Sequence, residues 1–306
     1  MNPTLVLNHL WQSTAFLAAA AVVVWALRGR AARVRFWVWM AASLKFLVPF
    51  GALAALGGWL GALAPAGAGA AAVSAAPALA KAAAQLQVWI EPAPAAAATA
   101  AAGLSLWWLA AGVVWALGAM LLALRWWRSW RRLAAMARQA EPAKLAGAAV
   151  LLTGAGIEPG VVGILRPRIL LPRDLPQRLE PPQLVAVMAH EHCHIARRDN
   201  LWSALHMVVE CLFWFHPLVW WLGARLVAER ERACDEAVLT SGCDRAAYAG
   251  GMVAVCRFYL ESPLACTAGI SGGGLRARVA RVLDGHWGRK LSRTQQTLLA
   301  TLAALA

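Results

Sequence analysis

The chain has 306 residues, of which 60% are hydrophobic and only 14% are charged. A soluble domain carries roughly 25% charged residues, so this composition argues against an ordinary soluble protein. The formal net charge of +14 fits either nucleic-acid binding or the basic flanks of membrane helices. The arginines follow apolar runs, which favours the membrane, and we expect no direct nucleic-acid binding.

Three apolar segments are long enough to cross a bilayer, which takes about 20 residues per helix. They cover approximately residues 5–27, 36–60 and 104–127. The first segment is not a signal peptide, because no basic residue precedes it. The arginines that follow the first and third segments predict cytoplasmic ends there and an N-terminus outside. These arginines are Arg28, Arg30, Arg33 and Arg35 in the first group and Arg125, Arg128, Arg131, Arg132 and Arg138 in the second.

The sequence divides into three predicted regions. Residues 1–138 form the membrane helices, with an Ala/Pro-rich outside loop of low complexity at 65–103. Residues 139–290 form a cytoplasmic domain. Residues 291–306 are the start of a truncated fourth membrane helix. We therefore expect a multi-pass protein of a bacterial-type inner membrane, in contact with membrane lipid. All six cysteines lie in the second half without a CxxC pair, which indicates a reducing compartment.

The cytoplasmic region mixes short strands with helices. Residues 148–172 contain β-prone runs separated by Gly and Pro, which predicts a small sheet or hairpin. "EPPQLVAVMAHEHCHIARR" then begins a helix, because two prolines suit its first turn. Further helices are expected at about 201–215 and 218–240, and an amphipathic basic helix follows a Gly-rich linker in the tail. The predicted fold is a mainly α membrane protein with an α+β cytoplasmic domain.

The helix that begins at "EPPQL" carries the motif HExxH. Residues four apart share one helix face, whereas residues two apart point away from each other. His190 and His194 can therefore bind one metal ion, and His192 cannot join them. Glu191 lies beside the first ligand. In a metallopeptidase the two imidazoles bind Zn²⁺, and the glutamate takes a proton from the attacking water.

A catalytic zinc needs a third protein ligand, and the sequence offers two candidates. Glu210 lies in an apolar helix one turn after His206. Glu231 lies in "AERERACDEAV", one turn before Asp235, which can hydrogen-bond a histidine ligand as such sites commonly need. We favour Glu231. Neither Cys193 nor Cys234 is expected on the ligand face, so the site is predicted to be open, with three protein ligands.

Several motifs together resemble one family. "HEHCHIARRD", "FWFHPLVWWLGARL" and "ERERACDEAVL" resemble the membrane zinc metallopeptidases of the BlaR/MecR antirepressor type. They are more distantly similar to the CAAX-prenyl-protease and HtpX group, whose glutamate ligand also lies in an ExxxD pattern. The resemblance extends to "HLWQSTAFLAAA", "GILRPRILLP" and "LRARVARVLDG", so that it covers nearly the whole chain.

The resemblance implies a gluzincin-like zinc site with one Zn²⁺ per chain. Its ligands would be His190, His194 and Glu231, and Glu191 would be the general base. Asp235 would hydrogen-bond a histidine ligand without binding the metal itself. Arg197 and Asp199 match the family's HxxRxD extension, and the alternative for them is a polar cap at the helix end. His216, in the motif FHP, is either structural or catalytic, and we favour a structural role.

We interpret the chain as an integral-membrane zinc endopeptidase with a signal-transducing, antirepressor-like role. By the resemblance, it would cleave itself, a cytosolic transcriptional repressor, or both. The Gly-rich stretch "GISGGGLRARV" (269–279) is the expected place of self-cleavage. We expect no C-terminal extracellular sensor and therefore no β-lactam sensing, and the sequence is either a fragment or a shorter member that uses a different signal. An extended edge in "GILRPRILLP" would pair with a substrate strand, or it would only pack on the metal helix.

A second interpretation comes from another functional class. The chain would be a non-catalytic membrane scaffold or a metal-binding regulatory protein, with structural zinc or none. A closed structural site usually has four protein ligands, which argues against this alternative. Substitution of Glu191 separates the two, because only a peptidase loses its function while it retains zinc.

Overall fold

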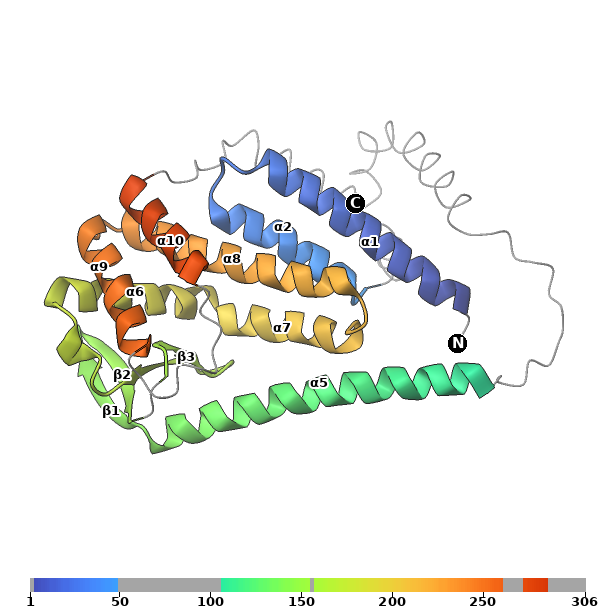
Figure 1. Cartoon of the computed structure of the whole chain (residues 1–306), viewed down its shortest axis with the longest axis horizontal. Helices are drawn as coiled ribbons and strands as arrows, with labels where there is room; N and C mark the ends of the chain where they lie inside the picture. Colours follow the sequence, from blue (N-terminus) through green and yellow to red (C-terminus); the bar gives the residue numbers. More distant parts are fainter. Residues whose placement is uncertain (1–2, 49–105, 155–156, 261–271, 286–306) are drawn as a thin grey trace, which may run out of the picture.

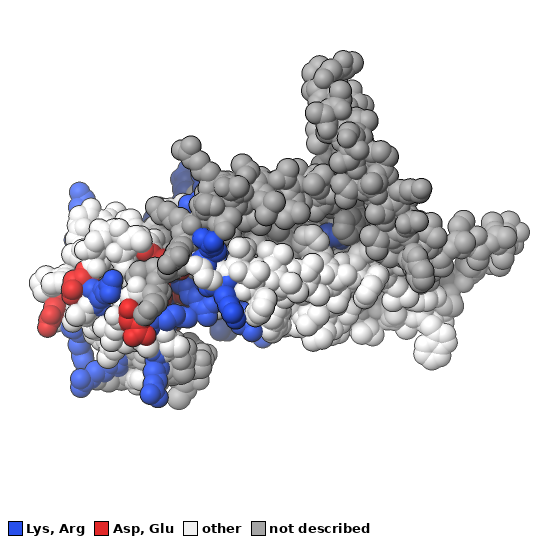
Figure 2. Space-filling model, turned by 90° about the horizontal axis from the view of Figure 1, so that it is seen from above, with Lys and Arg blue, Asp and Glu red and all other residues white. Residues whose placement is uncertain are grey.

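The computed structural model describes residues 3–48, 106–154, 157–260 and 272–285 (Figure 1). Within these ranges, long helices occupy one end of the molecule, and a small sheet with shorter helices occupies the other. Figure 2 shows that the charged side chains gather at the sheet end, while the visible surface of the helical end is almost uncharged. Charged groups are costly in hydrocarbon, so this separation fits a membrane-embedded bundle beside an aqueous domain.

Among the described residues, two helices are long and apolar enough to cross a membrane, α1 (Pro3–Ala26) and α5 (Leu106–Gln139). They correspond to the first and third expected segments. No residue of α5 is buried, and its Trp107 is 84% exposed. A continuous exposed apolar surface of this kind indicates contact with lipid. The helix continues past residue 127 through the basic cluster, because Leu, Ala, Met and Arg all favour the helical state.

The second expected segment differs from the prediction. Helix α2 (Ala32–Lys45) begins before residue 36 and has 14 residues, which corresponds to about 21 Å of helix and is less than the roughly 30 Å of a bilayer core. Its Phe36, Trp39 and Met40 are buried rather than exposed. The rest of the segment lies outside the described residues, as do the loop at 65–103 and the fourth segment at 291–306.

Helices α7 (Asp199–Leu212) and α8 (Pro217–Thr240) form a hairpin that packs against α1 and α2 (Figure 1). Both expected helices are confirmed to within a few residues, and Pro217 occupies the first turn of α8 as prolines prefer. The buried side chains between these four helices include Leu17, Phe36, Trp39, Met40, Phe46, Val209, Val219, Leu222 and Leu226. The apolar core therefore extends across the predicted boundary at residue 138.

Two tryptophans connect α5 to the end of α7. The indole nitrogen of Trp115 donates to the carbonyl of Leu212 over 2.8 Å, and that of Trp214 donates to the carbonyl of Trp115 over 3.2 Å. The indole of Trp214 lies against Gly118, where a Cβ atom would collide with the ring. Gly118 therefore permits the close approach that joins the exposed helix to the bundle.

The small sheet is confirmed and has four strands. They are β1 (Glu141–Leu145), β2 (Ala148–Thr153), β3 (Gly160–Val162) and β4 (Arg168–Pro172), in the order β1-β2-β4-β3. The β2–β4 pair is parallel, and the other two pairs are antiparallel. Ala146 and Gly147 both have positive φ, as a two-residue hairpin turn between β1 and β2 requires. Sheet residues Val150, Ile169 and Leu171 pack against α6.

Helix α6 (Pro181–Arg197) begins where the sequence predicts. Glu180 and Gln183 form a capping box, in which each side chain bonds the backbone N–H of the other residue. After α8 come α9 (Arg245–Leu260), which the sequence analysis does not predict, and α10 (Gly272–Asp284), which matches the expected basic helix. Their core with α6 and α8 contains Ala186, Val238, Tyr248, Ala249, Met252 and Val282. This core lies directly behind the HExxH motif.

Candidate metal centre

The two histidines of the HExxH motif point at one place. His190 and His194 lie one turn apart on α6, with their Nε2 atoms 3.2 Å apart and their rings nearly perpendicular. His190 is only 9% exposed. His192 is not part of this pair, because its Nδ1 atom lies 2.9 Å from the carbonyl oxygen of Met188 in its own helix. As the helix period predicts, His190 and His194 lie on one face of α6 and His192 does not.

Helix α8 brings Glu231 to the two histidines. Its Oε2 atom lies 3.4 Å from Nε2 of His190, and its Oε1 atom lies 3.8 Å from Nε2 of His194. One ligand atom from each of the three residues lies within 4.8 Å of the others. The other sequence candidate, Glu210, lies elsewhere, 3.4 Å from His206 in the helical bundle. The geometry thus favours Glu231 as the third ligand.

His194 is supported by a residue close to it in sequence. Its Nδ1 atom lies 2.7 Å from Oδ2 of Asp199, and Nε of Arg197 donates to Oδ1 of the same carboxylate over 3.1 Å. Arg198 between them is left-handed, with φ 55° and ψ 40°, and ends α6. This reversal lets Asp199, the first residue of α7, turn back to the last turn of the metal helix. Asp199 therefore contacts a candidate metal ligand, and Arg197 contacts Asp199, so their role is not limited to a polar cap at the helix end.

His190 is supported by residues distant in sequence. The hydroxyl oxygen of Tyr248 on α9 lies 2.8 Å from Nδ1 of His190, and the hydroxyl donates to Oδ1 of Asp235 over 2.8 Å. Asp235 itself is 3.6 Å from that Nδ1 atom. We expected Asp235 to bond the histidine directly, but Tyr248 lies between them. Arg278 on α10 completes the set, with Nη2 donating to Asp235 over 2.6 Å.

Tyr248 and Arg278 are the two residues that sequence reasoning missed. Tyr248 lies in "DRAAYAGG", which contains no motif with a chemical meaning. Arg278 lies in "LRARVARVLDG", which carried part of the family resemblance, but no role was assigned to any of its residues. The motif "LRARVARVLDG" was therefore the one sequence feature that could have pointed to Arg278. Burial, followed by the charge of Asp235, raises the pKa of the Tyr248 hydroxyl, so it remains a proton donor.

Glu191 is buried beside the ligand group, with 6% of the residue exposed. Burial raises the pKa of its carboxyl to about 7, opposed by the charge of His194 and reinforced by that of Glu231. A pKa near neutrality suits a group that must accept and return a proton. For Glu231, burial also favours the neutral form, but the hydrogen bond to His190 and the charge of Arg230 hold its pKa well below the usual range.

Two cysteines lie near the candidate ligands. The Sγ atom of Cys234 lies 3.4 Å from Nδ1 of His194 and 3.7 Å from Oδ2 of Asp199. The nitrogen of His194 that faces His190 and Glu231 is Nε2, so the expectation that Cys234 lies off the ligand face stays a prediction. Cys193 is hydrogen-bonded to Cys234. The thiol of Cys234 contacts the outer nitrogen of His194, so it belongs to the support of that residue.

His216 lies in the helical bundle. Its Nε2 atom is 3.1 Å from the hydroxyl of Thr14 on α1, and its ring packs against Phe46 at 5.5 Å between ring centres. It is also the residue immediately before α8. These contacts join α1, the end of α2 and the α7–α8 turn, which favours the structural role for the FHP motif.

The strand within "GILRPRILLP" is β4, which pairs with β2 on one side and with β3 on the other. The expectation of a free edge in this motif was therefore wrong, because both sides of the strand are already hydrogen-bonded. The edge strand beside α6 is β3, which directly precedes the motif. The side-chain amide of Asn200 on α7 donates to the carbonyls of Val161 and Gly163, over 2.9 Å in each case. Glu158, just before β3, is close enough to the ligand group that the charges of Glu231 and Arg278 affect its pKa, which burial raises. The edge strand therefore lies near the candidate ligands.

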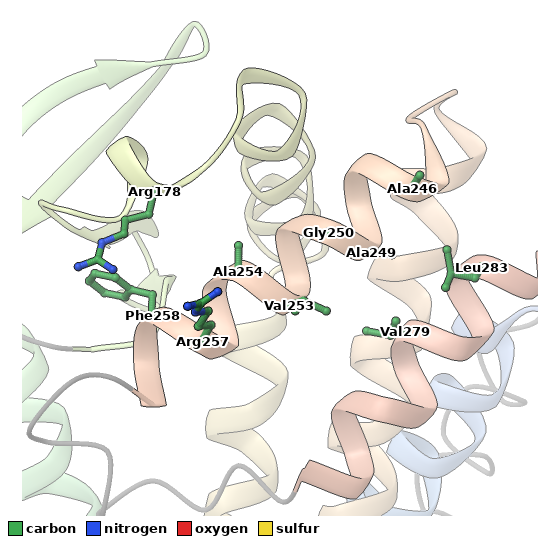
Figure 3. A pocket seen from close by; sticks show the side chains of 10 residues that line it. All are labelled: Arg178, Ala246, Ala249, Gly250, Val253, Ala254, Arg257, Phe258, Val279 and Leu283. Atoms are coloured by element: carbon green, nitrogen blue, oxygen red, sulfur yellow. The ribbon is translucent and has the colours of Figure 1, made fainter.

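A cavity of about 680 Å³ lies between α9 and α10 and is separate from the ligand group (Figure 3). Its lining is mainly small and apolar, with Arg178 and Arg257 on one side. None of the candidate ligands or their supporting residues lines it. The cavity is relevant to how α10 packs rather than to the metal group.

Two kinds of known regulatory protein resemble this chain over 81 residues each. The Regulatory protein BlaR1 of Bacillus licheniformis is 36% identical over 81 residues, which is 26% of this chain and 13% of that protein. The Methicillin resistance mecR1 proteins of Staphylococcus aureus and Staphylococcus epidermidis are 26% identical over 81 residues, or 14% of their length. These alignments thus cover a small part of each relative.

The family comparison covers much more of the chain. The family described as BlaR1 peptidase M56 matches residues 8–281, from the first helix to the last described one. This range includes the HExxH helix, Glu231, Asp235, Tyr248 and Arg278. The chain therefore belongs to the BlaR1 peptidase M56 family, whose members are membrane-associated metallopeptidases.

Proposed function

We propose that this chain is an integral-membrane zinc endopeptidase with His190, His194 and Glu231 as metal ligands. The observation that carries the proposal is the convergence of these three ligand atoms within 4.8 Å, beside the buried carboxyl of Glu191. Two histidines and one carboxylate are a ligand set of catalytic zinc, which leaves one position open for water or substrate.

The outer nitrogen of each histidine supports the fit to zinc. Nδ1 of His194 lies 2.7 Å from a carboxylate oxygen of Asp199, and Nδ1 of His190 lies 2.8 Å from the hydroxyl of Tyr248. An acceptor at Nδ1 keeps the proton there and leaves Nε2 unprotonated. Both Nε2 atoms are the ones that face each other and Glu231. The tautomers therefore match those that a zinc site requires.

Glu191 would act as general base and then as general acid. When bound, Zn²⁺ supplies Lewis acidity toward a water molecule and a peptide carbonyl. The carboxylate of Glu191 accepts the proton of the attacking water and passes it to the leaving amine. A substrate strand would pair with the backbone at the edge strand β3, which gives affinity with little sequence selectivity.

The charge distribution supports a cytoplasmic location for this site. Arg35, in the basic stretch after the first segment, pairs with Glu229 on α8 at 2.8 Å, two residues before Glu231. A basic stretch that follows an apolar segment marks the cytoplasmic side. We therefore propose that the N-terminus lies outside and that the metal group lies at the cytoplasmic end of the helices.

The proposed role is signalling by proteolysis, with a peptide or protein substrate. A cytosolic transcriptional repressor and the chain itself are the two substrates that we propose. Part of the stretch expected to be self-cleaved, 269–279, lies outside the described residues, and its remainder from Gly272 is helical in α10. A protease needs an extended substrate backbone, so cleavage within α10 would require that helix to unwind first.

The metal assignment is tested by counting zinc in detergent-purified protein with elemental mass spectrometry. We expect about one zinc per chain in the wild type and a large loss in Glu231→Ala. Glu210→Ala is the matched control, because Glu210 is also a buried acid on the α7–α8 hairpin but lies next to His206. Full zinc content in Glu231→Ala with a loss in Glu210→Ala would contradict the assignment.

The catalytic role is tested with Glu191→Gln, which keeps the size of the side chain and removes the basic oxygen. We expect this variant to retain its zinc and to lose cleavage of peptides, followed by mass spectrometry, and of the chain itself. Unchanged cleavage in Glu191→Gln would exclude the proposed mechanism. Zinc without any Glu191-dependent activity would favour a scaffold.

A further inference from the structure

Arg278 on α10 makes ionic contacts with two carboxylates of the candidate metal centre. Its Nε and Nη2 atoms donate to the two carboxylate oxygens of Asp235 over 3.1 and 2.6 Å. Its Nη1 atom lies 3.3 Å from Oε2 of Glu231. Arginine makes two parallel bonds to a carboxylate with fixed geometry, which lysine cannot do. One guanidinium thus orients two carboxylates at once.

These contacts reach two of the three candidate ligands. Glu231 is contacted directly, and His190 is reached through Asp235 and Tyr248. The side chain of Asp235 is only 4% exposed, so its hydrogen bonds come from protein groups. Burial alone would lower the pKa of Arg278, but the bond to Asp235 and the charges of both carboxylates raise it. Arg278 is therefore a permanent cation inside the network.

The apolar packing of α10 against the neighbouring helices is limited, so its ionic contacts contribute a larger share of its docking. Val282 is fully buried against α6, α8 and α9, but Leu283 remains 53% exposed. Val279 and Leu283 line the cavity that separates part of α10 from α9 (Figure 3). A cavity removes the dispersion contacts that its lining would otherwise make. The apolar contact of α10 is thus incomplete, and Arg278 supplies a contact of another kind.

We propose that Arg278 is a positioning residue of the metal centre and that it couples the docking of α10 to metal binding. The proposal rests on the proposed function in one respect, namely that the ion bound at His190, His194 and Glu231 is zinc. It adds two points to that function. Arg278 affects metal binding without binding the metal itself, and the docking of α10 and the binding of the metal depend on each other.

The direction of the effect follows from the hydrogen-bond geometry. Tyr248 donates to Oδ1 of Asp235, so its hydroxyl oxygen can accept from Nδ1 of His190. Nη2 of Arg278 donates to the same Oδ1 atom and Nε donates to Oδ2, which fixes the carboxylate where Tyr248 meets it. Without Arg278 the carboxylate loses this double contact, so the hydroxyl of Tyr248 and the ring of His190 are no longer held in one orientation toward the metal.

A second effect acts in the opposite direction but is smaller. A positive charge near the metal repels it, so removal of Arg278 relieves that repulsion. However, Arg278 is paired with Asp235 at 2.6 Å, and such a pair presents almost no net charge to an ion farther away. Loss of a partner behind a histidine ligand typically weakens metal binding by about 10- to 100-fold. We therefore expect weaker binding.

The experiment measures zinc affinity by competition with a chromophoric chelator in detergent, using the full chain. Arg278→Gln removes the charge, and Arg278→Lys keeps it without the double contact. Arg276→Gln is the control, because Arg276 lies two residues away on α10 and is exposed. We expect Arg278→Gln to bind zinc about 10- to 100-fold more weakly, Arg278→Lys to lie in between, and Arg276→Gln to match the wild type.

A spectroscopic measurement separates positioning from general destabilisation. Cobalt(II) substituted at the site absorbs visible light with a pattern that depends on ligand geometry. We expect Arg278→Gln to change this spectrum and Arg278→Lys to restore it in part, while Arg276→Gln leaves it unchanged. A cobalt spectrum and a zinc affinity in Arg278→Gln equal to those of the wild type would overturn the proposal, and the proposed function would stand.

Coupling between two sites is reciprocal, which gives an independent readout. If α10 docking strengthens metal binding, zinc must strengthen α10 docking by the same factor. We expect zinc to slow amide hydrogen exchange in α10 of the wild type and of Arg276→Gln, but not of Arg278→Gln. Equal zinc protection in all three proteins would overturn the coupling. A wild type that binds no zinc would overturn this proposal together with the proposed function.

Discussion

The two sides of the metal group are built in different ways. On the side of His194, the supporting carboxylate comes from Asp199, five residues later, across a single left-handed residue. On the side of His190, support comes from Tyr248 on α9, Asp235 on α8 and Arg278 on α10. One histidine is therefore oriented by local chain geometry and the other by the packing of three helices.

This difference has a consequence for function. The His194 side forms whenever α6 and the first turn of α7 form, since a short segment contains all its parts. The His190 side forms only when α8, α9 and α10 are packed together. Any signal that shifts one of these helices would change the His190 side first, because packed elements move as units while local turns persist.

The largest expected effect is on the local side, from Asp199→Ala. Asp199 is 1% exposed and is the acceptor for both His194 and Arg197. Its loss leaves the outer nitrogen of His194 without that acceptor, so we expect zinc affinity to fall by about 100-fold. Chelator competition measures this. Asp199→Asn, which retains an acceptor oxygen, should fall by less, and equal affinity in Asp199→Ala and wild type would contradict a supporting role.

A smaller effect is expected on the distant side, from Tyr248→Phe. The substitution removes the hydroxyl between His190 and Asp235 and keeps the buried ring. Asp235 still has its contact with Arg278 at 2.6 Å, so the carboxylate keeps a partner that orients it. We expect zinc to bind about tenfold more weakly, with the same chelator assay as readout. A loss as large as that of Asp199→Ala would mean that the two sides are not as different as their connectivity implies.

Double substitutions sharpen the comparison further. Tyr248 and Asp235 share one hydrogen bond, so the combined variant Tyr248→Phe with Asp235→Asn should depart from additivity by about 0.5–3 kcal/mol in zinc binding. Tyr248→Phe with Asp199→Asn combines opposite sides without a shared partner. Its effects should add to within about 0.5 kcal/mol. Strong coupling between opposite sides would show that both belong to one network.

The smallest effect is expected from Arg197→Gln. Arg197 donates to Asp199, and its guanidinium also lies 5.2 Å from the ring centre of Phe36 on α2. Asp199 keeps its contact with His194 when Arg197 is lost, so we expect about 1 kcal/mol, or roughly a fivefold weaker affinity for zinc. Isothermal titration of zinc into the purified variant measures it. A loss of 100-fold would make Arg197 a principal support rather than a secondary one.

Local sequence patterns predicted much of the fold. The long apolar runs of α1 and α5, the prolines that begin α6 and α8, and the β-prone runs of the sheet all gave elements close to those observed. These features depend on the helix period, on length and on residues at the ends of elements. The same period placed His190 and His194 on one face. Helix α9 was missed, although Asp244 directly before it accepts a hydrogen bond from the backbone N–H of Ala247, as an N-cap residue does.

Tertiary structure decided the rest of the site. Glu210 and Glu231 are both acids on helices after the motif, and their sequence distances from His194 do not say which one returns to it. The packing of α8 against α2 and α6 brings Glu231 to the histidines and leaves Glu210 beside His206. The positions of Tyr248 and Arg278 likewise depend on how α9 and α10 pack. Contacts between residues far apart in the chain have no local period to reveal them.

The sequence by itself thus determined an apolar protein with basic segment ends and a metal-binding pair one turn apart, because each of these features lies within a single element. Only the tertiary structure decided which acid completes the group, which hydroxyl lies between His190 and Asp235, and which arginine neutralises that carboxylate. The physical reason is that a catalytic site needs buried polar groups to satisfy one another, and their partners come from whichever elements the hydrophobic core brings together.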